Sequence, residues 1–297
     1  MKILVTGGAG FIGSHLSMKL RRHGHDVHII DFDDKITDDM KNKYTCHGYD
    51  LSKKEWIKNV GHFDYVFHIA AQSGGRPSLD DPQTDCLWNC LATANVVDFC
   101  RQTKPKKVFY TSSMAVYGNA MNVTEYTPPD PISFYGVSKL AGENYIKLLS
   151  LYDIPYTIFR LFATYGSGQD LQNLKQGIVS IYLSYALKDN VIPITGKKDR
   201  VRQLVHVDDV CDAMYMCLLL KYTDNETYNI VNEEVCTPEF IINTISKHLK
   251  KELTINEIDG YLGDQTYITG KSDKIRKIGW CPKYDLDHGV REFVEKI

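Results

Sequence analysis

A tyrosine and a lysine four residues apart are the side chains in this sequence best suited to acid–base chemistry. Tyr135 and Lys139 lie in the run Tyr-Gly-Val-Ser-Lys, shortly after the hydroxyl-rich segment Thr111-Ser112-Ser113. On a helix this spacing places both side chains on one face, about one turn apart. A phenol with an ordinary pKa near ~10 is a poor base at neutral pH, but a nearby cation favours its ionised form. Tyr135 can then exchange a proton with a substrate hydroxyl, which yields a ketone if a hydride acceptor lies beside it.

A glycine-rich turn near the start of the chain predicts the site of that acceptor. The run Thr6-Gly7-Gly8-Ala9-Gly10-Phe11-Ile12-Gly13 follows an expected strand and opens an expected helix. Glycines permit a tight turn and let a pyrophosphate approach the helix N-terminus. We therefore expect a dinucleotide site formed by Gly7, Gly10, Phe11, Ile12 and Gly13.

An acidic residue after the second expected strand indicates which dinucleotide binds. Asp31 lies 18 residues after Gly13. Its carboxylate can accept hydrogen bonds from ribose hydroxyls and would repel a 2'-phosphate, so NAD is favoured over NADP. The alternative is a glycine turn without a ligand and a loop carboxylate at Asp31.

Short β-branched runs alternate with longer amphipathic stretches, which predicts an α/β fold with a doubly wound parallel sheet of the Rossmann type. Helices are expected near 12–23, 81–102 and 134–151. We expect an NAD-binding domain over residues 1–165 and a smaller C-terminal substrate lobe over 166–297, with a segment near 203–231 returning to the sheet. The expected strands are Lys2–Thr6, Asp26–Asp31, Tyr65–Ala70, Lys107–Thr111 and Tyr156–Leu161.

The composition narrows the class of protein. The 297 residues are 43% hydrophobic and 24% charged, which is ordinary for a soluble enzyme. A net charge of -2 gives no basic field for nucleic acid or an anionic membrane. No apolar run approaches the ~18 residues of a membrane span, and the first residues do not read as a signal peptide, so a cytoplasmic location is expected.

The cysteines give no metal-binding pattern. Eight are scattered along the chain, and we expect them to be reduced and mostly buried. Cys86 and Cys90 share a helix face, but no CxxC pair or matched histidine accompanies them, so no metal site is expected.

Together these motifs resemble the extended short-chain dehydrogenase/reductase family. Within it, the chain is similar to nucleotide-sugar 4-epimerases of the UDP-glucose or UDP-glucuronate type, over nearly its whole length. The order and spacing of the motifs carry the resemblance. They are the glycine turn, Asp31, Asp50-Leu51, His68-Ile69-Ala70-Ala71, Ser112-Ser113 with Val116-Tyr117-Gly118, and Tyr135 to Lys139.

The resemblance implies a role for each catalytic residue. Tyr135 would be the acid/base, Lys139 would lower its pKa and hold the nicotinamide ribose, and Ser113 would hydrogen-bond the reacting hydroxyl. Ser113 is preferred to Ser112 because it precedes Tyr117 by four residues. Further cofactor contacts are implied for Asp50, Leu51, Ala70 and Ala71.

The residues after Ser113 narrow the reaction. Similar sugar 4,6-dehydratases carry an Asp-Glu pair there, and related decarboxylases keep the Glu. A carboxylate at that place can move a proton at the carbon next to the transient ketone. This sequence has Met114-Ala115. Elimination is therefore disfavoured, and oxidation followed by re-reduction is the simpler reaction.

The resemblance also suggests substrate contacts. Arg202 is similar to an arginine that binds the nucleotide diphosphate, and its planar guanidinium suits that task. Asn173 resembles part of a diphosphate-binding loop, although a solvated amide is the alternative. The segment 72–78, with Ser73 and Arg76, is similar to uronate epimerases, and Arg76 can meet a substrate carboxylate or face water.

Several positions depart from the family or allow two interpretations. Ala163 stands where many relatives have an asparagine that holds the sugar nucleotide, and Tyr261-Leu262 stands before Gly263-Asp264 where relatives often have an arginine. Asn89 either supports the catalytic helix or is an ordinary helix amide. The pair Asp208-Asp209 is interpreted as a helix N-cap followed by a first-turn acid.

Three functions are compatible with these features. The first is a nucleotide-sugar 4-epimerase with tightly held NAD. The second is a 4-ketosugar reductase or dehydrogenase that uses the same three residues, and the third is a sensor that binds dinucleotide without catalysis. The expected partners are a nucleotide-diphosphate sugar and a second copy of the chain, because relatives usually dimerise through helices like 81–102 and 134–151.

Overall fold

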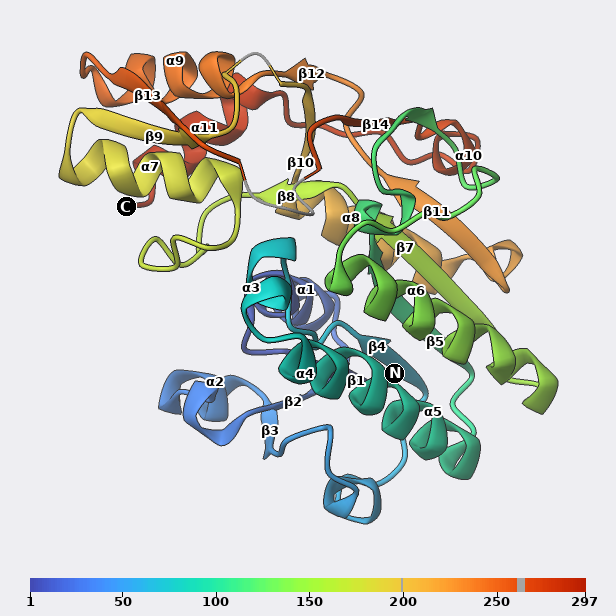
Figure 1. Ribbon diagram of the computed structural model, residues 1–297. Helices are drawn as coiled ribbons and strands as arrows, with labels where there is room; N and C mark the ends of the chain where they lie inside the picture. Colours follow the sequence, from blue (N-terminus) through green and yellow to red (C-terminus); the bar gives the residue numbers. More distant parts are fainter. Residues whose placement is uncertain (199, 261–264) are drawn as a thin grey trace.

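The computed structural model describes residues 1–198, 200–260 and 265–297, and a seven-stranded sheet lies at its centre (Figure 1). Its strand order is β11-β7-β5-β4-β1-β2-β3, and all its strand pairs are parallel. The strands are β1 (Lys2–Thr6), β2 (Asp26–Asp31), β3 (Thr45–Gly48), β4 (Tyr65–His68), β5 (Lys107–Ser113), β7 (Tyr156–Leu161) and β11 (Glu226–Ile230). The chain order reverses between β1 and β4, which is where doubly wound sheets bind ligands. The predicted fold class is confirmed.

Helices cover both faces of this sheet. On one face α1 (Phe11–Arg22) packs with α8 (Val207–Leu219), and on the other α5 (Ala92–Thr103) lies beside α6 (Phe134–Lys147) (Figure 1). Strand β1 shows why the strands read as continuous apolar runs. Ile3 and Val5 join the core under α1 and α8, whereas Leu4 joins the core under α5.

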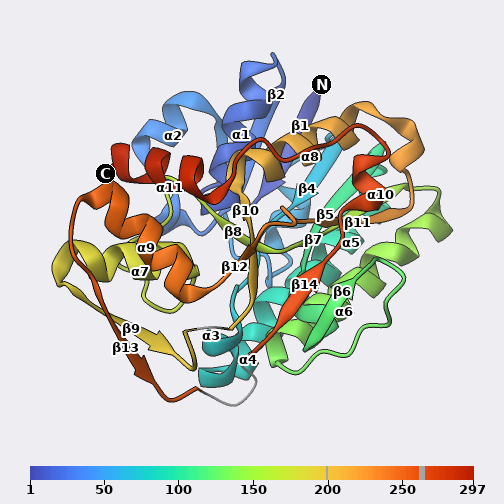
Figure 2. The ribbon, with the colours of Figure 1, turned by 90° about the horizontal axis from the view of Figure 1, so that it is seen from above.

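A second group of elements lies beside the sheet, and Figure 2 shows α7, α9 and α11 gathered around β9 and β13. Its core contains apolar side chains from all three helices. The helices are α7 (Ile178–Lys188), α9 (Pro238–Leu249) and α11 (Leu286–Glu295), and the strands are β8 (Ala163–Tyr165), β9 (Val191–Thr195), β10 (Arg202–His206), β12 (Val235–Cys236) and β13 (Thr254–Ile258). The shorter elements are α2 (Asp38–Lys43), α3 (Gly75–Asp80), α4 (Pro82–Asp85), β6 (Ala120–Val123), β14 (Ile268–Gly270) and α10 (Asp273–Arg276).

The structure differs from the expected elements at β3, at two of the helices and in the segment 203–231. Strand β3 was not expected, because its four residues carry no clear apolar pattern. The helix expected over 81–102 consists of α4, a π-helical segment Cys86–Leu91 and α5, and the helix expected over 134–151 ends at Lys147 before a 3₁₀ turn. Within 203–231, β11 joins the large sheet, but β10 pairs with β8 and β12.

No helix in the described part of the chain combines the length and apolar character needed to cross a membrane. The eight cysteines are all free thiols, and four of them are buried. Cys86 and Cys281 are exposed.

Candidate active site

The glycine turn connects β1 to α1 at the carboxyl edge of the sheet. Gly7 has φ +69°, and a Cβ there would lie 2.7 Å from the backbone of Ala70. A Cβ on Gly13 would lie 2.0 Å from the Gly7 carbonyl oxygen, so only glycine lets the helix start this close to the strand. Gly10 is the N-cap residue of α1 and has no side chain to fill the space before the helix. Phe11 and Ile12 form the first turn, where backbone N–H groups can receive a phosphate.

The carboxylate of Asp31 faces this turn from the end of β2. One oxygen accepts from the Ala9 N–H at 3.0 Å and the other from the Phe32 N–H at 2.9 Å. Burial raises its pKa, and the two backbone hydrogen bonds oppose that shift. The structure therefore brings the predicted ribose ligand and the predicted phosphate turn together.

The other predicted cofactor residues follow neighbouring strands at the same edge. Ala70 and Ala71 follow β4, and the Ala70 N–H donates to the Thr6 carbonyl at 3.1 Å. Asp50 and Leu51 follow β3, which pairs with β2 beside Asp31. The Leu51 side chain is buried in the core, so a contact with the cofactor would involve its backbone.

Tyr135 lies in the first turn of α6, which starts from a capped end. The Ser133 hydroxyl accepts from the Gly136 N–H at 3.1 Å, and the Ser78 hydroxyl accepts from the Tyr135 N–H at 3.1 Å. Burial raises the pKa of the Tyr135 phenol to about 12, and a hydrogen bond with Ser113 opposes the shift. Tyr135 and Ser113 are thus neighbours, as the motif spacing predicted.

Lys139 lies one turn later on α6 and is buried. Its ammonium group is 4.5 Å from the centre of the Tyr110 ring. Burial lowers the pKa of Lys139 to about 7, and the charges of Asp85 and Glu143 oppose the shift. The prediction that Lys139 lowers the pKa of Tyr135 stays a prediction. In the structure, the hydrogen bond with Ser113 lowers the pKa of the Tyr135 phenol against the effect of burial.

The two adjacent serines have different partners. Ser112 is buried and donates to Glu143 Oε1 at 2.6 Å. Ser113 ends β5, and its hydroxyl accepts from the Ala115 N–H at 3.2 Å. The choice of Ser113 over Ser112 agrees with this geometry, since only Ser113 faces Tyr135.

A buried polar network beneath α6 was missed by the sequence interpretation. Arg160 on β7 makes a bidentate ion pair with Glu143, and its Nη1 donates to the Tyr117 hydroxyl at 2.8 Å. Tyr117 in turn donates to Asn229 Oδ1 at 2.7 Å. One signal was available, because Arg160 interrupts an apolar strand and such a charge needs a partner.

Two of the predicted substrate residues, Ser73 and Asn173, lie on loops that touch each other, and a third, Arg76, lies in α3 just after the first loop. The Gln176 side chain donates to the Ser73 carbonyl, which joins the loop after β4 to the loop that carries Asn173. Arg76 pairs with Asp80 at 3.5 Å, and Lys175 pairs with the same carboxylate at 2.9 Å.

Asn173 and Arg202, two of the predicted contacts of the diphosphate, already have hydrogen-bond partners within the protein. Asn173 Oδ1 accepts from the Lys175 N–H at 3.1 Å, which closes a turn. Arg202 begins β10, is buried, and donates from Nη1 to the Thr266 carbonyl at 3.1 Å and from Nη2 to the Gln265 carbonyl. Arg202 therefore holds the chain beside the segment 261–264, and this segment, with Tyr261-Leu262 and Gly263-Asp264, lies outside the described residues. Ala163 begins β8.

The prediction that Asp208 caps a helix is wrong. His206 is the N-cap of α8, and its Nδ1 accepts from the Asp208 N–H at 3.3 Å. Asp209 is buried and accepts from the backbone N–H groups of Lys283 and Tyr284, as a first-turn acid.

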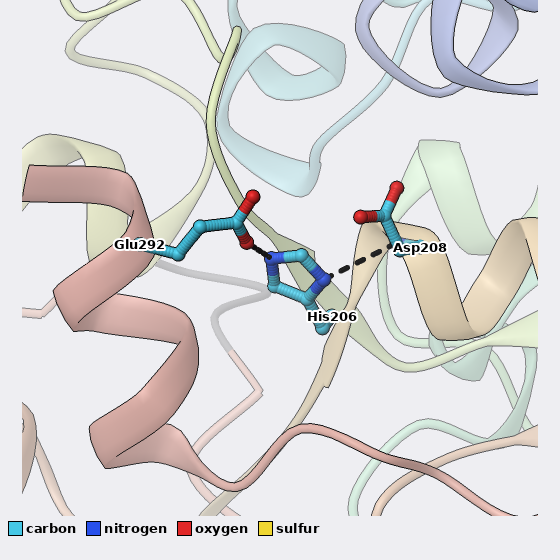
Figure 3. A group of neighbouring side chains, drawn as sticks. All are labelled: His206, Asp208 and Glu292. Carbon is cyan, nitrogen blue, oxygen red and sulfur yellow. Dashed lines mark hydrogen bonds and ion pairs between the residues drawn. The ribbon is translucent and has the colours of Figure 1, made fainter. Parts of the chain in front are cut away.

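His206, Asp208 and Glu292 form a group whose possible ligand atoms lie within 4.8 Å of one another (Figure 3). His206 Nε2 is 3.0 Å from Glu292 Oε2, whereas the Asp208 carboxylate is turned away from this ring and lies 3.2 Å from His15 Nδ1. The three side chains therefore do not converge on one point. They link α11 and α1 to the start of α8.

Comparison with known proteins finds relatives that cover most of this chain. A protein of Methanocaldococcus jannaschii is 35% identical over 315 residues, which span 98% of this chain and 97% of that protein. A UDP-glucose 4-epimerase of Mycolicibacterium smegmatis is 34% identical over 229 residues, which span 72% of each chain.

Solved structures agree in fold over the whole chain. UDP-glucose 4-epimerase of Thermotoga maritima with UDP-glucose is 28% identical, with a TM-score of 0.92 over 100% of this chain and 98% of that one. UDP-glucuronic acid 4-epimerase of Bacillus cereus, in complex with UDP-glucuronic acid and NAD, is 27% identical, with a TM-score of 0.91 over 100% and 98%. Residues 3–231 match the family described as NAD dependent epimerase/dehydratase, which confirms the predicted resemblance and the predicted cofactor. This chain belongs to the NAD-dependent epimerase/dehydratase family.

Proposed function

We propose that this protein is a nucleotide-sugar 4-epimerase. The observation that carries the proposal is the contact between Tyr135 and Ser113, one helical turn from Lys139, at the sheet edge that bears the glycine turn and Asp31. A base, a hydroxyl and a cation beside a dinucleotide site are the groups needed to oxidise and re-reduce an alcohol.

Each of the three side chains has a distinct part in the reaction. Tyr135 takes the proton from the hydroxyl on carbon 4, and Ser113 holds that hydroxyl by a hydrogen bond. Lys139 binds the nicotinamide ribose. When bound, NAD would supply the hydride acceptor and donor for carbon 4, and the glycine turn, Asp31 and Lys139 would hold it. Burial raises the pKa of Tyr135 to about 12, so a positive charge nearby would be needed to favour its phenolate at neutral pH.

The neighbourhood of Ser113 favours epimerisation over elimination. Met114 and Ala115 occupy the positions after Ser113, so this turn carries no carboxylate to move a proton at the next carbon. Glu143 lies one turn after Lys139 on α6, but its carboxylate is bound by Arg160 and Ser112. The transient keto sugar therefore returns to an alcohol.

The second group of elements, after residue 166, is proposed to bind the rest of the substrate. Relatives with known ligands bind UDP-glucose or UDP-glucuronic acid. Arg202 and Asn173 are proposed contacts of the diphosphate, and Ser73 and Arg76 of the sugar. A carboxylate on the sugar would compete with Asp80, 3.5 Å away, for the Arg76 guanidinium.

A panel of UDP-, GDP-, CDP- and dTDP-sugars, followed by NMR without added cofactor, tests the proposal. Inversion at carbon 4 is expected for at least one sugar. A net-redox 4-ketosugar reductase uses the same residues, and continuous consumption of added NADH without inversion would establish that function instead. A dinucleotide sensor would bind NAD and turn over no sugar.

A homodimer is proposed from the surface of α6 and the segment before α5. Apolar side chains lie exposed on both, including Phe134 and Val137 on α6 and Leu87 and Leu91 in the segment before α5. Light scattering after size-exclusion chromatography is expected to give twice the chain mass. A cytoplasmic location remains a prediction.

A further inference from the structure

A buried carboxylate lies close to the Tyr135/Lys139 pair and has no part in the mechanism given above. Asp85 is the last residue of α4 and is 1% exposed. Asn89 Nδ2 donates to Asp85 Oδ1 at 2.9 Å and to the Ser138 hydroxyl at 2.9 Å. Since Ser138 precedes Lys139, one amide joins Asp85 to the turn of α6 that carries the lysine.

The π-helical segment Cys86–Leu91 lets Asn89 make these contacts. Such wide turns inside helices occur often at functional sites. Asn89 Nδ2 also donates to the Gln72 carbonyl at 3.1 Å, in the loop that carries Ser73. Asn89 therefore holds three parts of the site in register: the loop after β4, Asp85 and the catalytic helix. The structure favours the interpretation that Asn89 supports this helix.

The charges around Lys139 single out Asp85. A buried ammonium group needs a counter-charge. Glu143 is one candidate, but Arg160 neutralises it through two contacts of 2.8 Å. Asp85 is also buried, and its hydrogen bond from Asn89 comes from a neutral amide, which does not neutralise the carboxylate. The titratable groups that face Lys139 are Asp85 and Cys90 from the segment before α5, Tyr135 and Glu143 from α6, Tyr110 from β5 and His68 from β4.

We propose that Asp85 is the counter-charge that keeps Lys139 protonated in the active site, and so a positioning residue for the reaction. The proposal rests on the proposed function, in which Lys139 holds the cofactor ribose as a cation. Burial lowers the pKa of Lys139 to about 7, and Asp85 is the largest of the charges that oppose this shift. The same carboxylate raises the pKa of Tyr135. Loss of the Asp85 charge therefore lowers both pKa values.

Direct titration of Lys139 tests the counter-charge without any assay of turnover. The protein is labelled with ¹³C in the lysine side chains, and the Lys139 signal is identified by its loss in Lys139→Arg. In Asp85→Asn, which keeps an oxygen for Asn89, the titration midpoint is expected to fall by about one pH unit. Asp98→Asn on α5 is the control, because this carboxylate is partly exposed and pairs with Arg101. An unchanged Lys139 midpoint in Asp85→Asn would overturn the proposal.

The pH profile of turnover links the counter-charge to the reaction. Both limbs of the kcat profile should move to lower pH in Asp85→Asn, since the base and the cation titrate at lower values. Asp85→Glu should restore the parent profile. A lower plateau with unmoved limbs would show a purely structural role and overturn the positioning role.

Two outcomes keep this proposal separate from the proposed function. A lowered Lys139 midpoint in a protein that epimerises no sugar supports the counter-charge and removes the epimerase. If Asp85→Asn does not fold, Ser138→Ala removes the hydroxyl that holds Asp85 and should lower the midpoint in the same direction. An unchanged midpoint in that variant would count against Asp85.

Discussion

Glu143 and Arg160 form a bidentate ion pair in the interior, with distances of 2.8 Å from Nε to Oε1 and from Nη2 to Oε2. Both side chains are buried, and Ser112 donates to the same carboxylate. Glu143 lies one turn after Lys139 on α6, whereas Arg160 lies on β7. The pair therefore fixes the catalytic helix against the sheet.

Glu143→Gln is expected to lower the free energy of unfolding by about 3 kcal/mol, because it leaves Arg160 as a buried charge without a partner. Urea denaturation at pH 7 measures the change. Lys147→Gln is the control, since this ammonium lies 3.5 Å from Glu143 but is well exposed, and its loss should change the free energy of unfolding by less than about 0.5 kcal/mol. A loss below about 1 kcal/mol in Glu143→Gln would contradict the structural role.

Tyr135→Phe is expected to reduce kcat by about 10²-fold or more, because general acid–base catalysis contributes that much. The Kd for NAD should stay within about threefold of the parent value, since a phenyl ring keeps the packing. Tyr145→Phe, on an exposed face of the same helix, is the control. Unchanged turnover in Tyr135→Phe would remove the phenol from the mechanism.

Asp31→Asn is expected to raise the Kd for NAD about tenfold, because hydrogen bonds to a charged group contribute about 1.5–3 kcal/mol. The parent protein should bind NAD more tightly than NADP, and the variant should lose most of this preference because the repulsion of a 2'-phosphate is gone. Isothermal titration calorimetry with both dinucleotides measures the preference, with the exposed Asp34→Asn as the control. Tighter binding of NADP by the parent would overturn the assignment of Asp31.

His68 is expected to make the protein less stable in acid. It is buried between the hydroxyls of Thr6 and Thr93, and burial lowers its pKa to about 3. An unfolded histidine takes up a proton below about pH 6.5, so the contribution of neutral His68 is complete above that pH and is lost progressively down to about pH 3.

Between pH 7 and pH 5, His68 should lower the free energy of unfolding by about 2 kcal/mol. Urea denaturation of the parent and of His68→Asn at both pH values measures it, and the variant should lack that part of the difference. His62→Asn at the surface should keep it. An equal pH dependence in the parent and in His68→Asn would show that His68 is not the acid-sensitive group.

The local pattern of the sequence was enough to predict the fold class and to propose the cofactor residues. Strands β1, β2 and β7 have the expected bounds, because a parallel strand covered on both faces is a continuous apolar run between polar residues. Gly7, Gly13 and Asp31 could be placed because each is tied to a strand end, and parallel strands bring their carboxyl ends to one edge.

Other features depend on contacts between residues distant in the sequence, and only the tertiary structure decides them. The π-helical segment Cys86–Leu91 follows no local pattern, and His206 rather than Asp208 caps α8 because of how β10 meets the helix. The charge state of Tyr135 and Lys139 is the clearest case. Their spacing on α6 is local, as is Glu143 on the same helix, but their pKa values also depend on burial and on Ser113 and Asp85, which approach from β5 and α4. The sequence by itself determined which groups are proposed for the chemistry, whereas tertiary packing decided how their protons are held.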